Sequence, residues 1–116
     1  MNKLNLETLI HNVIKWGAAK GLTKPEAATK QTLKMFSEAG ELADNVIKDA
    51  DVRDDIGDVL VTLILLAEIK GTTFEECLNV AYADIADRKG VTLDGVFIKS
   101  TDPKYASAVA MLEGRK

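Results

Sequence analysis

The chain has few of the residues that build disulfides, soft-metal sites or irregular folds. Its 116 residues include a single cysteine, Cys77, which predicts no internal disulfide and fits a reducing, cytoplasmic setting. One histidine and two prolines leave long stretches free to form helices. The first residues show no signal-peptide apolar run, and the longest apolar run, Val59–Ala67, is about half of what a membrane helix needs. No membrane association is predicted.

The charge balance is slightly negative, with 15 Lys and Arg against 18 Asp and Glu. Binding to nucleic acid or to an anionic membrane requires clustered positive charge, so neither is predicted as a partner. A hydrophobic share of 47% with 28% charged residues is typical of a globular protein and not of a disordered one. The length fits a single domain over residues 1–116.

Apolar residues recur at helical spacing through most of the chain. Four helices are predicted: from a cap at Asn5 to Gly21, from a capping box at Thr23 and Glu26 to about Lys48, from the acidic turn 48–54 to about Lys70, and from a capping box at Thr73 and Glu76 to Gly90. Residues 90–103 contain glycines and a short β-branched alternation, which predicts an ordered irregular segment with an extended piece. Asp102-Pro103 then starts a short last helix. The predicted fold class is all-α, a bundle of four main helices.

The predicted third helix is apolar on all sides after Asp58. A helix with this pattern is surrounded by protein, which four helices of one small chain achieve incompletely. A homo-oligomer would complete the burial, and symmetric dimers are the most common kind. The alternative is that this helix is the central helix of a monomer.

Two pairs of carboxylates stand out on the second and third predicted helices. Glu38 and Glu41 are three residues apart, as are Asp55 and Asp58, so each pair points to one side of its helix. In an antiparallel hairpin that turns around Asp49–Asp51, Glu41 and Asp58 lie roughly level, because both are nearly equally far from the turn. Four carboxylates would then converge on one cleft.

Converging carboxylates repel one another unless a cation neutralises them. A ligand set made only of oxygens favours a hard ion, Mg²⁺ or Mn²⁺ ahead of Ca²⁺, and Mg²⁺ commonly shares its shell with substrate phosphates. The alternative is a solvated helix face, because Lys34, Glu38, Glu41 and Asn45 form a stripe opposite an apolar face. That apolar face consists of Phe36, Ala39, Ala43, Val46 and Ile47.

The stretches "SEAGELADNV" and "RDDIGDVLVTLILLAEIKGTTFEEC" resemble the MazG-like family of all-α nucleoside triphosphate pyrophosphohydrolases. The family signature, ExxE followed by ExxD, reads here as Glu38-x-x-Glu41 and Asp55-x-x-Asp58, and the tail "DRKGVTLDGVFIKSTD" resembles the ending of small phage and bacterial members. Asp55 departs from the usual Glu, and Ser37 stands where a further Glu is frequent.

This resemblance implies hydrolysis of an NTP or dNTP to the monophosphate and pyrophosphate, with Mg²⁺. It also implies a homodimer or a tetramer built from dimers, with the nucleotide between helices of adjacent subunits. The four residues of the signature, Glu38, Glu41, Asp55 and Asp58, become metal ligands and catalytic residues, and one of them helps to activate the nucleophile.

Several residues are candidates for contact with the nucleotide. Trp16 would stack on the base, as an aromatic residue does in the family, or is an ordinary core or interface tryptophan. Lys34 would meet a phosphate, or forms an i,i+4 pair with Glu38. Arg88, Lys89 and Lys99 would offset the charge of the triphosphate, or are surface charges.

A function of a different class remains open. The chain could be a helical oligomerisation or regulatory module that keeps the fold without activity, although the intact acidic quartet argues against this. A di-iron carboxylate bundle needs Glu-x-x-His pairs, which a single histidine, remote from the acidic pairs, cannot supply. Cys77, among apolar residues at a helical position, is expected to be a packing residue.

Overall fold

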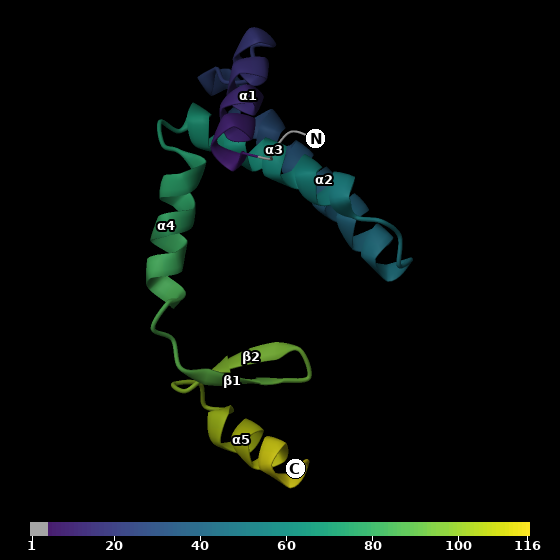
Figure 1. The fold of residues 1–116 in the computed structure, drawn as a ribbon, viewed down its shortest axis with the longest axis vertical. Helices are drawn as coiled ribbons and strands as arrows, with labels where there is room; N and C mark the ends of the chain where they lie inside the picture. The colour runs from purple at the N-terminus through teal and green to yellow at the C-terminus, as the bar shows by residue number, and fades with distance from the viewer. Residues whose placement is uncertain (1–4) are drawn as a thin grey trace. The chain divides into compact units, whose positions relative to one another are not determined.

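A computed structural model describes residues 5–116 as mostly helical, with one small sheet (Figure 1). The elements are α1 (Leu6–Ala19), the 3₁₀ turn η1 (Pro25–Ala27), α2 (Ala28–Ile47), α3 (Arg53–Ile69), α4 (Phe74–Ile85), β1 (Gly90–Leu93), β2 (Val96–Lys99) and α5 (Tyr105–Gly114). The chain divides into two compact units, an N-terminal unit that ends at Leu78 and a C-terminal unit, Asn79–Lys116. That the chain forms a single domain stays a prediction.

The N-terminal unit is built around the contact between α2 and α3. These helices run side by side as an antiparallel hairpin, and α1 lies against α3 (Figure 1). The most buried side chains belong to α3, where Leu65 and Thr62 are each 1% exposed. The Thr62 hydroxyl donates to the Val59 carbonyl at 2.7 Å, which satisfies its hydrogen-bonding need inside the apolar interior. Helix α3 is therefore the core element on which the other two helices rest.

Four of the predicted helix boundaries are confirmed. Asn5 caps α1, because its side-chain oxygen accepts from the Thr8 backbone N–H at 3.0 Å. Gly21 and Gly71 have positive φ angles of 74° and 75° just after α1 and α3. The Thr73 hydroxyl accepts from the backbone N–H of Glu76 at 3.0 Å, at the start of α4.

The capping box predicted at Thr23 and Glu26 does not form. Lys24 is extended, with φ −80° and ψ 148°, because a residue before proline is driven out of the helical region. The chain therefore enters η1 at Pro25 before α2 begins, and Ala27, at the N-cap of α2, provides no side-chain cap.

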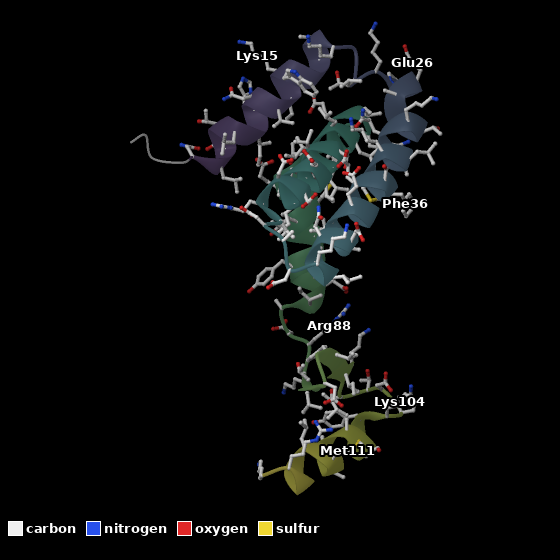
Figure 2. All side chains as sticks on the ribbon, turned by 90° about the vertical axis from the view of Figure 1, so that its right-hand side faces the viewer. Lys15, Glu26, Phe36, Arg88, Lys104 and Met111 are labelled. Atoms are coloured by element: carbon white, nitrogen blue, oxygen red, sulfur yellow. The ribbon has the colours of Figure 1, made fainter. Side chains whose placement is uncertain are left out.

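The inward face of α2 is the one that the predicted carboxylate cleft requires for Glu38, and not the apolar face that the solvated-face alternative would bury. The expected apolar face is largely exposed, including Phe36, which is labelled in Figure 2, and Ile47. The inward positions mix polar and apolar groups: Gln31 is only 6% exposed, and Met35, Glu38, Leu42 and Asn45 are half-buried. Lys34 and Glu41 are exposed. A polar stripe that faces a neighbouring helix is unusual for a helix whose only task is packing. These inward polar groups therefore indicate a candidate site between α2 and its neighbouring helices.

Apolar surface is also exposed on α3 and α4. A groove of about 550 Å³ is lined by residues of both helices and of the link between them, among them Leu60, Leu63, Phe74 and Leu78. Cys77 lines this groove and is exposed, so the expectation that it packs in the interior is wrong. Over residues 5–116, no helix combines the length and the apolar character that crossing a membrane requires.

The C-terminal unit contains a β-hairpin where an irregular segment was predicted. β1 and β2 pair antiparallel, with Leu93 opposite Val96, and α4 ends at Ile85 instead of continuing to Gly90. The connecting residues Asp94 and Gly95 both have positive φ, 51° and 80°. Two successive positive φ angles are the mark of a type I′ turn, which Asp-Gly favours and which matches the twist of the strands. The all-α prediction is thus correct only in part.

The predicted last helix is confirmed as α5, which packs on the hairpin (Figure 1). The Arg115 guanidinium lies 2.9 Å from the Asp94 carboxylate and ties the end of α5 to the hairpin turn. This hydrogen-bonded ion pair lowers the pKa of Asp94. Both side chains are exposed, so the pair contributes little to stability on its own.

Gly17 sets how closely α1 approaches α3, which yields a prediction. A Cβ atom added at Gly17 would overlap the side chain of Leu65, which is 1% exposed, so Leu65 would have to shift from its packed position. Gly17→Ala should therefore lower the free energy of unfolding by about 1–3 kcal/mol, although alanine favours helix. Urea unfolding measures this change. Gly57→Ala, within α3, is the matched control, since a Cβ there meets no atom within 4 Å, and an equal loss in both variants would contradict the close approach.

Candidate metal and nucleotide site

The N-terminal unit holds a pocket of about 460 Å³ between α1, α2 and α3. Its polar and aromatic lining comes from all three helices: Asn12, Trp16, Gln31, Lys34, Glu38, Asp58 and Thr62. Leu65 and other apolar side chains complete the wall. This volume lies within the range of about 300–1,000 Å³ that is common for small-molecule sites, which are typically apolar with a few convergent polar groups.

Three of the four predicted carboxylates lie near one another. Glu38 and Asp58 both line the pocket, one from α2 and one from α3, and Glu41 lies one turn beyond Glu38. Partial burial raises the pKa of Glu38, and the neighbouring carboxylates of Glu41 and Asp58 raise it further. Lys34 acts in the opposite direction and more weakly. Repulsion among like charges thus remains largely uncompensated here, which is the condition that a bound cation relieves.

The residues fit a magnesium ion that shares its coordination with a substrate. Within residues 5–116, no three Asp, Glu, His or Cys side chains are grouped closely enough to hold a metal ion by themselves. Mg²⁺ does not require such a group, because it keeps several waters and commonly takes only one or two carboxylates plus substrate phosphates. Glu38 and Asp58, with Glu41 beside them, offer that kind of all-oxygen set from two helices.

Asp55 differs from the other three carboxylates. It is 9% exposed, and both of its oxygens accept from the Asn45 side-chain amide, at 3.1 and 3.0 Å. This bond joins α2 to α3 and places residues 45 and 55 face to face, five residues on either side of Ala50. The predicted hairpin register is therefore correct. Asn45 was noticed in the sequence only as part of a polar stripe, and no local pattern marked it as a partner of Asp55.

The residues predicted to contact the base and the phosphates fall in two different pockets, one in each unit of the chain. Trp16 and Lys34 line the pocket with Glu38 and Asp58, and Trp16 is half-exposed, not enclosed in the core. No ion pair joins Lys34 to Glu38 in the described part of the chain. The basic side chain of Lys34 is thus free for another partner.

Two pocket residues escaped the sequence reasoning, Asn12 and Gln31. Each lies at helical spacing from a candidate that was found, since Asn12 precedes Trp16 by four residues and Gln31 precedes Lys34 by three. Side-chain amides carry both donors and acceptors, which suits hydrogen bonding to the edge of a base. The helical spacing was the signal that could have revealed them.

Arg88, Lys89 and Lys99 lie in the C-terminal unit. They line a hollow of about 260 Å³ together with Ser100 and Thr101. Arg88, labelled in Figure 2, already forms an ion pair with Asp84 at 2.6 Å. Contact of these three cations with a nucleotide stays a prediction.

Comparison with known proteins gives one relative of unknown function. The chain is 33% identical over 66 residues to an uncharacterized 18.2 kDa protein encoded in the rep-hol intergenic region of Haemophilus phage HP1 (strain HP1c1). The matched segment spans 55% of this chain and 40% of the phage protein, so this chain covers less than half of that relative. No protein-family model matches the chain, and no solved structure matches it.

The raised pKa of Glu38 predicts how stability depends on pH. Folding raises the pKa of Glu38, so the folded state holds the proton of this carboxyl group up to a higher pH than the unfolded state does. As the pH rises from the ordinary carboxyl pKa through the raised pKa, the ionised Glu38 therefore lowers the free energy of unfolding more and more. Without divalent metal, Glu38→Gln should therefore be more stable than the wild type at pH 7, and the difference should shrink near about pH 4. Urea unfolding in EDTA at both pH values measures this. Glu68→Gln, at an exposed position of α3, is the control, and a destabilised Glu38→Gln at pH 7 would refute the crowding of charge.

Proposed function

We propose that this chain is a metal-dependent nucleoside triphosphate pyrophosphohydrolase of the MazG-like kind. It would cleave the anhydride between the α- and β-phosphates of an NTP or dNTP to give the monophosphate and pyrophosphate. The observation that carries the proposal is the pocket in which Trp16, Lys34, Glu38 and Asp58 meet from three helices. An aromatic face, a cation and clustered carboxylates are the groups that a base, a phosphate and a bound Mg²⁺ require.

Each group has a distinct role in this proposal. Trp16 stacks on the base, and the amides of Asn12 and Gln31 donate to and accept from its edge. Lys34 donates to a phosphate oxygen. Glu38, Glu41 and Asp58 hold Mg²⁺ or Mn²⁺, and one of these carboxylates orients the attacking water. When bound, the metal offsets the charge of the phosphates and lowers the pKa of that water.

The proposal includes a second copy of the chain, as a homodimer or a tetramer of dimers. The exposed face of α2 repeats at alternating spacings of three and four residues, the pattern of a helix–helix seam. This seam consists of Leu33, Phe36, Gly40, Ala43 and Ile47. A helix of a partner that covers this seam would act as the fourth helix beside α1, α2 and α3 and so complete a four-helix MazG-like bundle.

A second candidate function is a helical oligomerisation or regulatory module without activity. The same exposed seam and the groove on α3 and α4 favour it, because both serve association whether or not catalysis occurs. It gives no reason for the half-buried polar stripe of α2 or for the crowded carboxylates. The enzyme therefore accounts for more of the structure.

The enzymatic proposal predicts release of pyrophosphate from at least one member of a panel of NTPs and dNTPs with Mg²⁺. Glu41→Gln and Asp58→Asn should each lower the rate by about 100-fold or more with the helical circular dichroism unchanged, because each removes a metal-holding charge. Glu68→Gln should keep the wild-type rate. An absence of pyrophosphate across the whole panel with either Mg²⁺ or Mn²⁺ would favour the inactive module.

The oligomer has its own test, light scattering at micromolar concentration. The wild type should show at least twice the mass of one chain. Phe36→Glu places a charge in the α2 seam and should shift the mass toward the monomer, since burial of an unpaired charge is strongly unfavourable. Val96→Lys, at an exposed position of β2, should leave the mass unchanged. A monomeric wild type would refute the seam as an interface.

A further inference from the structure

Asp55 and Asn45 form the best-defined polar contact between α2 and α3. The Asn45 amide, in the last turn of α2, lies 3.1 Å from one oxygen of Asp55 and 3.0 Å from the other. Asp55 is buried and Asn45 is half-buried, so the bond is shielded from competing water. A shielded hydrogen bond to a charged group is worth more than an exposed one.

The negative charge of Asp55 is compensated by the protein itself. Asp55 is the third residue of α3, in the first turn, where the helix dipole and the free backbone N–H groups favour a carboxylate. The Asn45 amide adds a donor to both oxygens. Glu38 and Asp58 differ, since both line the pocket and, over residues 5–116, no amide, hydroxyl or basic side chain donates to either carboxylate. The side-chain neighbour of Glu38 is another carboxyl group, that of Glu41.

We infer that Asn45 is a positioning residue that holds Asp55 as an anchor between α2 and α3, so that the metal ion is held by Glu38, Glu41 and Asp58 and not by Asp55. The part of the inference that concerns the metal ion rests on the proposed function, whereas the structural role of the Asn45–Asp55 pair does not. Asp is also one carbon shorter than the Glu that the resembling signature carries at this position. The shorter side chain is the length that meets Asn45 across the helix interface.

The anchor has a consequence for the site. Residues 45 and 55 face each other, so their bond fixes how far α2 slides along α3. Glu38 lies two turns before Asn45, and Asp58 lies nearly one turn after Asp55. The Asn45–Asp55 bond therefore sets the distance between the two pocket carboxylates without either residue contacting the ligand.

Exchanging the side chains of Asn45 and Asp55 tests whether Asp55 is a structural anchor or a metal ligand. Asn45→Asp alone sets two carboxylates against each other, whereas the double variant Asn45→Asp with Asp55→Asn restores an amide–carboxylate pair with the wild-type net charge. Asp55→Asn alone keeps an amide–oxygen hydrogen bond and removes only the charge. Asp58→Asn is the reference for loss of a ligand. Thermal unfolding without metal and Mn²⁺ titration by electron paramagnetic resonance are measured on each variant and on the wild type.

The anchor predicts a specific pattern. Asn45→Asp should unfold several degrees below the wild type, and the double variant should recover more than half of that loss. Recovery should stop short of the whole loss, because a carboxylate at position 45 opposes the dipole at the end of α2. Asp55→Asn and the double variant should bind Mn²⁺ within about threefold of the wild type, as expected when a charge is nearby but not coordinated. Asp58→Asn should lose about tenfold or more in affinity.

Two results would overturn the inference. If the double variant regains stability while its Mn²⁺ affinity falls as far as that of Asp58→Asn, Asp55 is a metal ligand. If Asn45→Asp unfolds at the wild-type temperature, the pair is no anchor. A wild type that binds no Mn²⁺ would count against the proposed function alone, because the unfolding temperatures still decide the anchor.

Discussion

The packing of α2 against α3 is the contact on which the rest of the N-terminal unit depends. Helix α3 supplies the most enclosed side chains, Thr62 and Leu65, and α1 reaches it through the space that Gly17 leaves open. Helix α2 turns a polar stripe toward α3, so the hairpin cannot be explained by apolar burial alone. The Asn45–Asp55 bond fixes the register of the two helices near their connection. Glu38 and Asp58 are in turn carried to one pocket.

The surroundings of each carboxylate in this hairpin indicate whether that residue stabilises the fold or serves a binding site. Asp55 is satisfied by an amide and by the start of a helix, which is how a buried carboxylate stabilises a fold. Glu38 instead has a raised pKa because it is partly buried beside Glu41 and Asp58, an arrangement that works against stability. An unfavourable cluster next to a pocket is typical of functional sites, where a ligand compensates for it. A hydrated Mg²⁺ bound together with a polyphosphate is the ligand that this chemistry favours.

The parts of the fold that follow from local rules could be predicted from the sequence. Asn5, Gly21, Gly71 and the Thr73 cap act through their own backbone neighbours, and the hairpin register follows from helix geometry alone. The β-hairpin was missed although Asp94-Gly95 carried its signal, because few residues flank the turn.

Other features depend on tertiary contacts. The sequence left two inward faces open for α2, because hydrophobicity normally marks the buried side. Only the fold shows that Gln31 and Glu38 face inward while Phe36 and Ile47 are exposed. The pairing of Asn45 with Asp55, and the entry of Asn12 and Gln31 into the pocket, depend on which residues meet across helices.

The central proposal is that the hairpin brings Glu38, Glu41 and Asp58 together as a divalent-metal site. Anomalous diffraction from crystals grown with Mn²⁺ and a non-hydrolysable nucleoside triphosphate tests it most directly. The account predicts a manganese peak within ligand distance of these carboxylates, with the base against Trp16, and a crystal with ordered nucleotide but no manganese at this position would contradict it.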